Sequence, residues 1–225
     1  MKHKKINNIL DFINYLENED MARGSWGFRG VPSSDYDLIP NIGRVDIRSP
    51  FHPGLERQIF ERFRQMAVPF VKIKPDNDIT WLALARHHGL PTRLLDWTLS
   101  PLVAAYFTTF EEPTRKGLSS DFSIYAYDSK YIDIPTIPQK TLDPFRLQNN
   151  YEEVHADHYS DRMAAQRGFF TLHKKPDDPF RHKTLIKFTF PSNVRSETVN
   201  YLDFYGINRA SLFLGLDGIA AYWAW

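Results

Sequence analysis

The segment from Ile79 to Thr98 constrains the fold more than any other part of the sequence. Apolar residues at helical spacing predict a buried helix over Ile79–His88, and Gly89 followed by Pro91 is typical of a helix end. An otherwise apolar strand or turn follows. Six polar side chains lie within the twelve residues from His87 to Thr98, and an unpaired buried charge costs several kcal/mol. These side chains therefore either pair with one another or line a site.

The remaining pattern predicts a single α+β domain over residues 1–225, with a small mixed sheet packed against several helices. An N-terminal surface helix falls within residues 1–22, and residues 23–225 form the core. Further helices are expected at 55–66, 102–110, 192–205 and 208–214, and strands at 24–30, 122–127 and 184–190. Residues 31–51 indicate a long loop, and 129–161 give no clear order. The apolar segment Ala220–Trp225 is expected to pack on the core.

The helix at 55–66 places Leu55, Ile59, Phe63 and Met66 on one face.

Composition excludes several classes of function. The chain has no cysteine, which rules out disulfides, thiolate metal sites and a cysteine nucleophile, and which suits a reducing cytoplasm. With 28 basic and 27 acidic side chains, it has no general excess of positive charge for strong non-specific nucleic-acid binding. No apolar run is long enough to span a membrane. The common glycine-rich nucleotide loops and hydrolase motifs are also absent.

The polar cluster after the buried helix contains His87, His88, Thr92, Arg93 and Asp96. Adjacent histidines point about 100° apart on a helix, so they do not form a two-histidine metal motif. Two structural alternatives remain open. Arg93 and Asp96 form an internal salt bridge in one, and a histidine interacts with the helix C-terminus in the other.

Arg29 stands between Phe28 and Gly30 on the predicted strand at 24–30. Glycines beside it allow another backbone or a ligand to approach closely. Its planar guanidinium suits phosphate or carboxylate, which favours a pyrophosphate or nucleotide ligand. The alternative is a salt bridge to an acidic partner such as Asp96.

Two later segments carry further candidates. Arg162 and Gln166 lie four residues apart, on one side of a predicted helical turn. His155 and His158 lie three apart in an acidic stretch, but no third ligand follows a metal-binding pattern. A metal site is therefore not expected.

These motifs together resemble the FRG domain family, which is named for the tripeptide found here at Phe28–Gly30. The resemblance continues through the long motif from His87 to Thr98, then Arg162–Phe170, and ends at Leu212–Gly218. It implies a component of a bacterial or phage toxin or defence system. Many ADP-ribosyltransferases also begin their NAD site with an aromatic-Arg-Gly strand. However, the Ser-Thr-Ser strand and Glu-x-Glu loop of those enzymes are absent here.

The resemblance implies an ADP-ribosyltransferase-like fold and an enzyme that transfers ADP-ribose from NAD or cleaves its glycosidic bond. No tightly bound cofactor is expected, because NAD would be the substrate. The implied catalytic residues are His88, Asp96 and Gln166, and the implied nucleotide-binding residues are Arg29, Gly30, His87, Thr92, Arg93 and Arg162. An antitoxin or defence-system partner is expected, and nucleic acid only as an acceptor. A binding module without chemistry and a nuclease are the alternatives.

Overall fold

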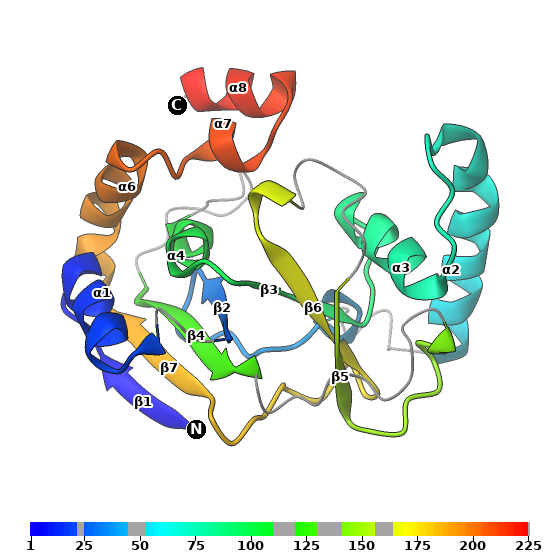
Figure 1. Ribbon diagram of the computed structural model, residues 1–225, viewed down its shortest axis with the longest axis horizontal. Coiled ribbons are helices and arrows are strands. Elements are labelled where there is room, and N and C mark those ends of the chain that lie inside the picture. Colours follow the sequence, from blue (N-terminus) through cyan, green and yellow to red (C-terminus); the bar gives the residue numbers. More distant parts are fainter. Residues whose placement is uncertain (22–24, 45–52, 110–119, 130–140, 156–163, 225) are drawn as a thin grey trace.

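A computed structural model describes residues 1–21, 25–44, 53–109, 120–129, 141–155 and 164–224 of the chain (Figure 1). Seven strands form one mixed sheet in the order β1-β7-β4-β2-β3-β6-β5. The first strand is parallel to its neighbour, and all the other pairs are antiparallel. The strands are β1 (Lys2–Lys5), β2 (Trp26–Val31), β3 (Leu94–Thr98), β4 (Phe122–Asp128), β5 (Tyr151–Val154), β6 (Gly168–His173) and β7 (Ile186–Phe190).

Seven α-helices are present in the described part of the chain, which confirms the α+β class. They are α1 (Ile9–Asn18), α2 (Pro53–Ala67), α3 (Asp78–His87), α4 (Pro101–Thr109), α6 (Arg195–Phe204), α7 (Arg209–Leu212) and α8 (Leu216–Trp223). Short 3-10 turns are η2 (Asn41–Arg44), η3 (Val68–Phe70) and η6 (Ser192–Val194). Within these residues, no helix combines the length and apolar character that crossing a membrane requires.

Local signals set the limits of the site-bearing helix α3. The Asn77 side chain accepts a hydrogen bond of 2.9 Å from the Thr80 backbone and begins the helix. Gly89 follows the end with φ at +90°, a left-handed conformation that glycine adopts without strain. The helix expected at 79–88 is thus confirmed to within one residue.

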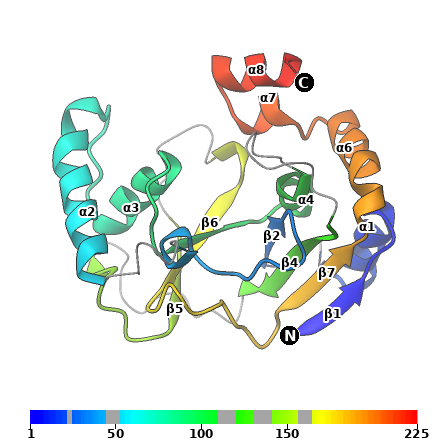
Figure 2. The ribbon, with the colours of Figure 1, turned by 180° about the vertical axis from the view of Figure 1, so that it is seen from behind.

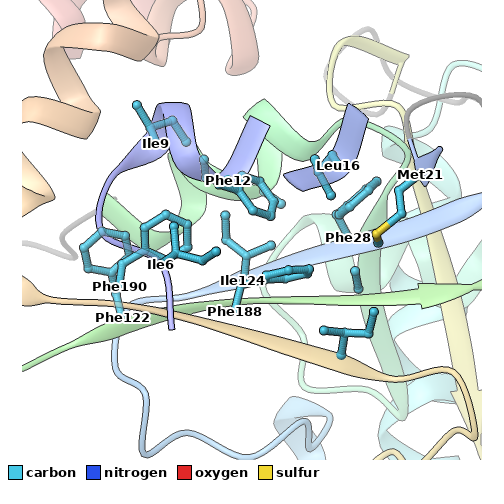
Figure 3. Close-up of a cluster of buried hydrophobic side chains, with 14 of the residues drawn as sticks. Ile6, Ile9, Phe12, Leu16, Met21, Phe28, Phe122, Ile124, Phe188 and Phe190 are labelled. Carbon is cyan, nitrogen blue, oxygen red and sulfur yellow. The ribbon is translucent and has the colours of Figure 1, made fainter. Parts of the chain in front are cut away.

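An aromatic core packs α1, α4 and α6 against strands β7, β4 and β2 of the sheet (Figure 3). Phe122 and Phe190 stack with ring centroids 4.9 Å apart, and Phe12 from α1 meets Phe188 and Phe190 edge-on. The N-terminal helix therefore belongs to the same core as the strands that follow it.

A second core packs α2 and α3 on β3, β5 and β6, through Phe60, Ile79, Leu82, Leu94 and Leu172 among others. A third core uses the neighbouring β3 residues Leu95 and Trp97 with Tyr127, Phe169 and Phe180. Figure 2 shows α1 and α6 along the β1–β7 end of the sheet, with α2 and α3 at the other end. Strand β3 lies between the two helical groups.

Several expectations need correction. Lys2–Lys5 forms an edge strand that the sequence pattern did not indicate, and β5 lies inside the segment for which no order was expected. Gly168–His173 is a strand that the sequence pattern did not indicate. The predicted apolar face of α2 is largely exposed at Leu55 and Met66, because Glu56 and Phe60 face the core instead.

The C-terminal expectation is also wrong. Ala220–Trp223 belongs to α8, and Trp223 is 80% exposed, so this segment does not bury its apolar side chains in the core.

Candidate functional site

Arg29, Asp96 and Arg86 come together from β2, β3 and α3. Arg29 Nη1 donates to the Asp96 backbone oxygen at 2.7 Å and lies 3.4 Å from Oδ2 of the same residue. Arg86 Nη2 donates to Asp96 Oδ2 at 2.6 Å, and its Nε lies 3.4 Å from Oδ1. Strands β2 and β3 pair in register at Phe28 and Thr98, which places Arg29 close to Asp96.

Two guanidinium groups, those of Arg29 and Arg86, meet the single carboxylate of Asp96 here. Burial alone would raise the pKa of Asp96, but the charges of Arg86 and Arg29 outweigh burial and lower the pKa to about 2. Burial lowers the pKa of Arg29 to about 10, with Arg86 and Arg44 adding to the effect, so Arg29 stays protonated at neutral pH. The group Arg29, Arg44, Arg86 and Asp96 is called the arginine cluster below.

Arg29 also has an unmet donor. Its Nε is buried and has no hydrogen-bond partner among the described residues. Buried hydrogen-bond donors are usually paired in proteins, so an unpaired one indicates a place where an acceptor such as a water, an ion or a ligand can bind. The side chains of Arg29 and Arg86 are each 15% exposed, whereas Asp96 is 41% exposed. Asp96 is therefore more accessible than the two arginines that contact it.

Gly30 and Gly27 make room for protein atoms. A Cβ on Gly30 would lie 1.9 Å from the Ala104 carbonyl oxygen of α4, and one on Gly27 would lie 2.5 Å from the Phe169 ring. The close approach that the glycines predicted is thus made by another backbone and by an aromatic ring. In this structure Gly30 positions α4 over β2 beside Arg29.

Arg93 pairs with Glu56, not with Asp96, so the internal pair expected as an alternative is wrong. The Arg93 guanidinium forms a buried ion pair with Glu56 of α2, donates to the Pro144 carbonyl oxygen at 3.2 Å and lies over the Phe145 ring. Thr92 is buried as well, and its Oγ1 lies 3.4 Å from the Leu94 amide nitrogen. Both side chains are enclosed by protein at the start of β3.

The two histidines end α3 directly after Arg86. Their rings lie 5.1 Å apart at an interplanar angle of 83°, with His88 exposed and His87 half-buried. His88 is the C-cap residue of the helix. These side chains are thus next to the arginine cluster in the chain.

Gln166 links β3 to the C-terminal helices. Its backbone oxygen accepts a hydrogen bond of 2.7 Å from Thr98, and its side-chain amide donates to the Leu212 oxygen at 3.1 Å. Thr98 lies two residues beyond Asp96 on the same strand. Arg162 and His158 lie outside the described residues.

Sequence reasoning missed Arg86 and Glu56. Arg86 follows the buried Leu82 by four residues on α3. Residues four apart share a helix face, so this spacing could have predicted that Arg86 faces the sheet. Glu56 gave no such signal, because it lies in a helix whose apolar residues indicate a different face. Glu56 anchors β3, and Arg86 fixes the Asp96 carboxylate.

Other features lie apart from this cluster. Glu153 accepts hydrogen bonds from Tyr127 at 3.0 Å and from His155 at 2.8 Å, and His155 stacks on Phe169. Across the described ranges, no group of three or more His, Asp or Glu side chains could hold a metal ion. A groove of about 630 Å³ lies along α2.

Comparison with known proteins gives one match. The model of the FRG domain family matches residues 24–117, a range that contains every member of the arginine cluster. No curated protein and no solved structure matches the chain. The chain therefore contains an FRG domain, and its Phe-Arg-Gly strand supplies the buried arginine of the candidate site.

Proposed function

We propose that the arginine cluster binds the phosphates of a nucleotide, and that the protein acts on NAD or a related dinucleotide. One observation carries this proposal: among the described residues, the guanidinium groups of Arg29 and Arg86 meet at a single carboxylate, that of Asp96, and the buried Nε of Arg29 has no hydrogen-bond partner. Phosphate oxygens supply the negative charge and the acceptors that such a place lacks.

The proposed reaction breaks the bond between nicotinamide and ribose. Nicotinamide leaves with the bonding electrons, and water or an acceptor nucleophile attacks the sugar carbon. Positive charge develops on the ribose as the bond breaks, and an ionised carboxylate nearby stabilises it. Asp96 fits this role because its low pKa keeps it ionised at neutral pH. His87 or His88 is proposed to orient the ribose hydroxyls.

A binding module without chemistry is the second candidate. It is favoured by the state of Asp96, whose carboxylate is already held by Arg86 through two contacts and by Arg29 through one. A carboxylate held in this way supports the two arginines and has less capacity to act on a sugar. Ligand binding without turnover follows from this arrangement.

The experiment that separates these candidates follows nicotinamide release and ADP-ribose transfer from labelled NAD in the presence of a cell lysate. The purified wild type is compared with Arg29→Ala and Asp96→Asn. Arg146→Ala is the matched control, because its side chain is 79% exposed and lies outside the cluster. NAD chemistry predicts release that Arg29→Ala and Asp96→Asn abolish and Arg146→Ala preserves.

Thermal stability with NAD, ADP or pyrophosphate completes the test. A ligand that binds the folded state raises the melting temperature whether or not it is consumed. Stabilisation without release supports the binding module. If none of these ligands stabilises the folded wild type and no release occurs, phosphate recognition by the arginine cluster is wrong.

The family resemblance adds a cellular proposal. A toxin or defence component acting on NAD in the cytoplasm slows growth when expressed, and Arg29→Ala relieves this effect. An antitoxin or defence-system protein is the proposed partner, and nucleic acid enters only as an acceptor of ADP-ribose. Normal growth with fully expressed wild type argues against a toxic activity.

A further inference from the structure

Helix α2 presents an apolar stripe to solvent. Leu55, Ile59 and Met66 follow one another at helical spacing and are all exposed. The stripe continues beyond the helix, where Phe70 is 85% exposed and Ile73 is 71% exposed. These five residues, with Val68, are called the α2 surface.

The charge on the α2 surface has one sign. Arg62, Lys72 and Lys74 are exposed and basic, whereas Arg57 lies on the opposite side of α2 and pairs with Asp143 at 3.9 Å. The acidic residues are otherwise engaged, because Glu56 is buried against Arg93 and Glu61 pairs with Arg64. The groove of about 630 Å³ runs along the same helix and is lined by Arg57, Arg62 and Phe145 among others.

A second apolar surface lies at the C-terminal helices. Leu216, Ile219 and Trp223 form an exposed stripe along α8. Tyr222 donates to Asp203 at 3.0 Å and so joins α8 to the end of α6, where Phe204 is 84% exposed. These residues, with Tyr205 and Leu214, are called the arm surface. The exposed charged residues between positions 203 and 224 are both acidic: Asp217, and Asp203, which also accepts from Asn208 at 3.0 Å.

The two surfaces match in chemistry and in size. Each exposes six large apolar side chains, from 36% to 85% on the α2 surface and from 47% to 84% on the arm surface. Large exposed apolar patches mark interaction sites, and a standard protein interface buries roughly 800 Å² per partner. One is flanked by basic residues and the other by acidic residues, which favours contact between them and disfavours contact of either with itself.

We propose that the arm surface of one copy docks on the α2 surface of a second copy of the same chain. Figures 1 and 2 show α2 and α8 on different sides of the molecule, so contact between them requires another molecule. Because two different surfaces meet, the assembly is head-to-tail and grows into a ring or a chain.

Mass in solution gives the first test. Interfaces of this size have dissociation constants from micromolar to picomolar, so light scattering at about 100 µM should show more than one chain of 26.3 kDa. Trp223→Asp, and Arg62→Glu combined with Lys72→Glu, should each give monomers. Leu10→Asp is the matched control, because Leu10 is an exposed apolar residue on α1, and it should assemble like the wild type. A wild type that stays monomeric at this concentration overturns the proposal.

Mixing the two disrupted variants gives the decisive test. Trp223→Asp keeps an intact α2 surface, and the variant with Arg62→Glu and Lys72→Glu keeps an intact arm surface. Their mixture should therefore form a dimer with one working interface, although each variant alone is monomeric. Circular dichroism of each variant confirms that the chain is folded.

Three outcomes overturn the proposal. In the first, the folded variants fail to form a dimer on mixing. In the second, only the arm substitution abolishes assembly, which assigns the contact to two arms. In the third, phosphatidylserine vesicles bind through Arg62 and Lys72 while the protein remains monomeric, which assigns the basic apolar α2 surface to an anionic membrane.

Discussion

Removing the Glu56 carboxylate should destabilise the protein strongly, because the carboxylate pairs with Arg93 inside the fold. Glu56 is 3% exposed and Arg93 4% exposed, and Glu56 also accepts from the Arg93 backbone nitrogen at 3.2 Å. Glu56→Ala leaves the guanidinium with two carbonyl acceptors, from Pro144 and His173, and no counter-charge. Breaking a buried ion pair in this way costs about 3–5 kcal/mol.

That cost is a large share of a total stability of about 5–15 kcal/mol. In urea denaturation with a slope of about 2 kcal/mol per molar, it shifts the midpoint down by about 2 M. In thermal unfolding it lowers the midpoint by roughly 10 °C for a chain of this length. Replacing both partners, Glu56→Leu with Arg93→Met, should cost less than Glu56→Ala alone, because no buried charge is then left unpaired.

A loss below about 1 kcal/mol at an unchanged slope would refute this reasoning, since a buried charge without a counter-ion cannot be tolerated so easily. The same variants also test the role of Arg93 suggested by the sequence. A ligand contact predicts that Arg93→Met abolishes nucleotide binding by the folded protein while Glu56→Ala does not. The ion pair predicts that both variants act through stability.

Three further outcomes follow from the structure. The pKa of Asp96 in the folded protein is about 2, so the stability that its ionised form contributes is present above the unfolded pKa near 4 and is lost as pH falls through about 2. Asp96→Asn should remove this pH dependence from acid unfolding curves. The free energy involved is on the order of 1 kcal/mol, because the carboxylate is partly exposed. Burial, with the charges of Arg29 and Arg93, lowers the pKa of His173 to about 3. The free energy of unfolding should therefore fall as pH drops from 6.5 toward 3, by at most about 1.4 kcal/mol per pH unit. In urea titrations, His173→Gln should flatten that slope. Gly30→Ala should cost 3 kcal/mol or more, roughly the upper range for overpacking, because the new methyl meets the Ala104 carbonyl oxygen; a melting temperature equal to wild type would contradict that packing.

Elements with strong local signals were predictable from the sequence. Helix α3 has an asparagine cap, an apolar body and a left-handed glycine after its end, and each of these acts over a few residues. Strand β1 was not predictable, because every side chain of Lys2–Lys5 is polar and exposed and the segment joins the sheet through its backbone alongside β7. The α2 apolar face was misleading, since burial of Glu56 depends on a partner 37 residues away in the chain.

The sequence alone determined which residues carry candidate chemistry, namely Arg29 and the polar segment that ends in Asp96. Only the tertiary structure decided how they pair. Arg29 and Asp96 are 67 residues apart and meet because β2 and β3 are neighbours in the sheet, while Arg86 reaches Asp96 from the packed helix. Helix and turn signals act through neighbours in the chain, whereas charges pair through space, so the partner of each charge follows from strand order and helix packing.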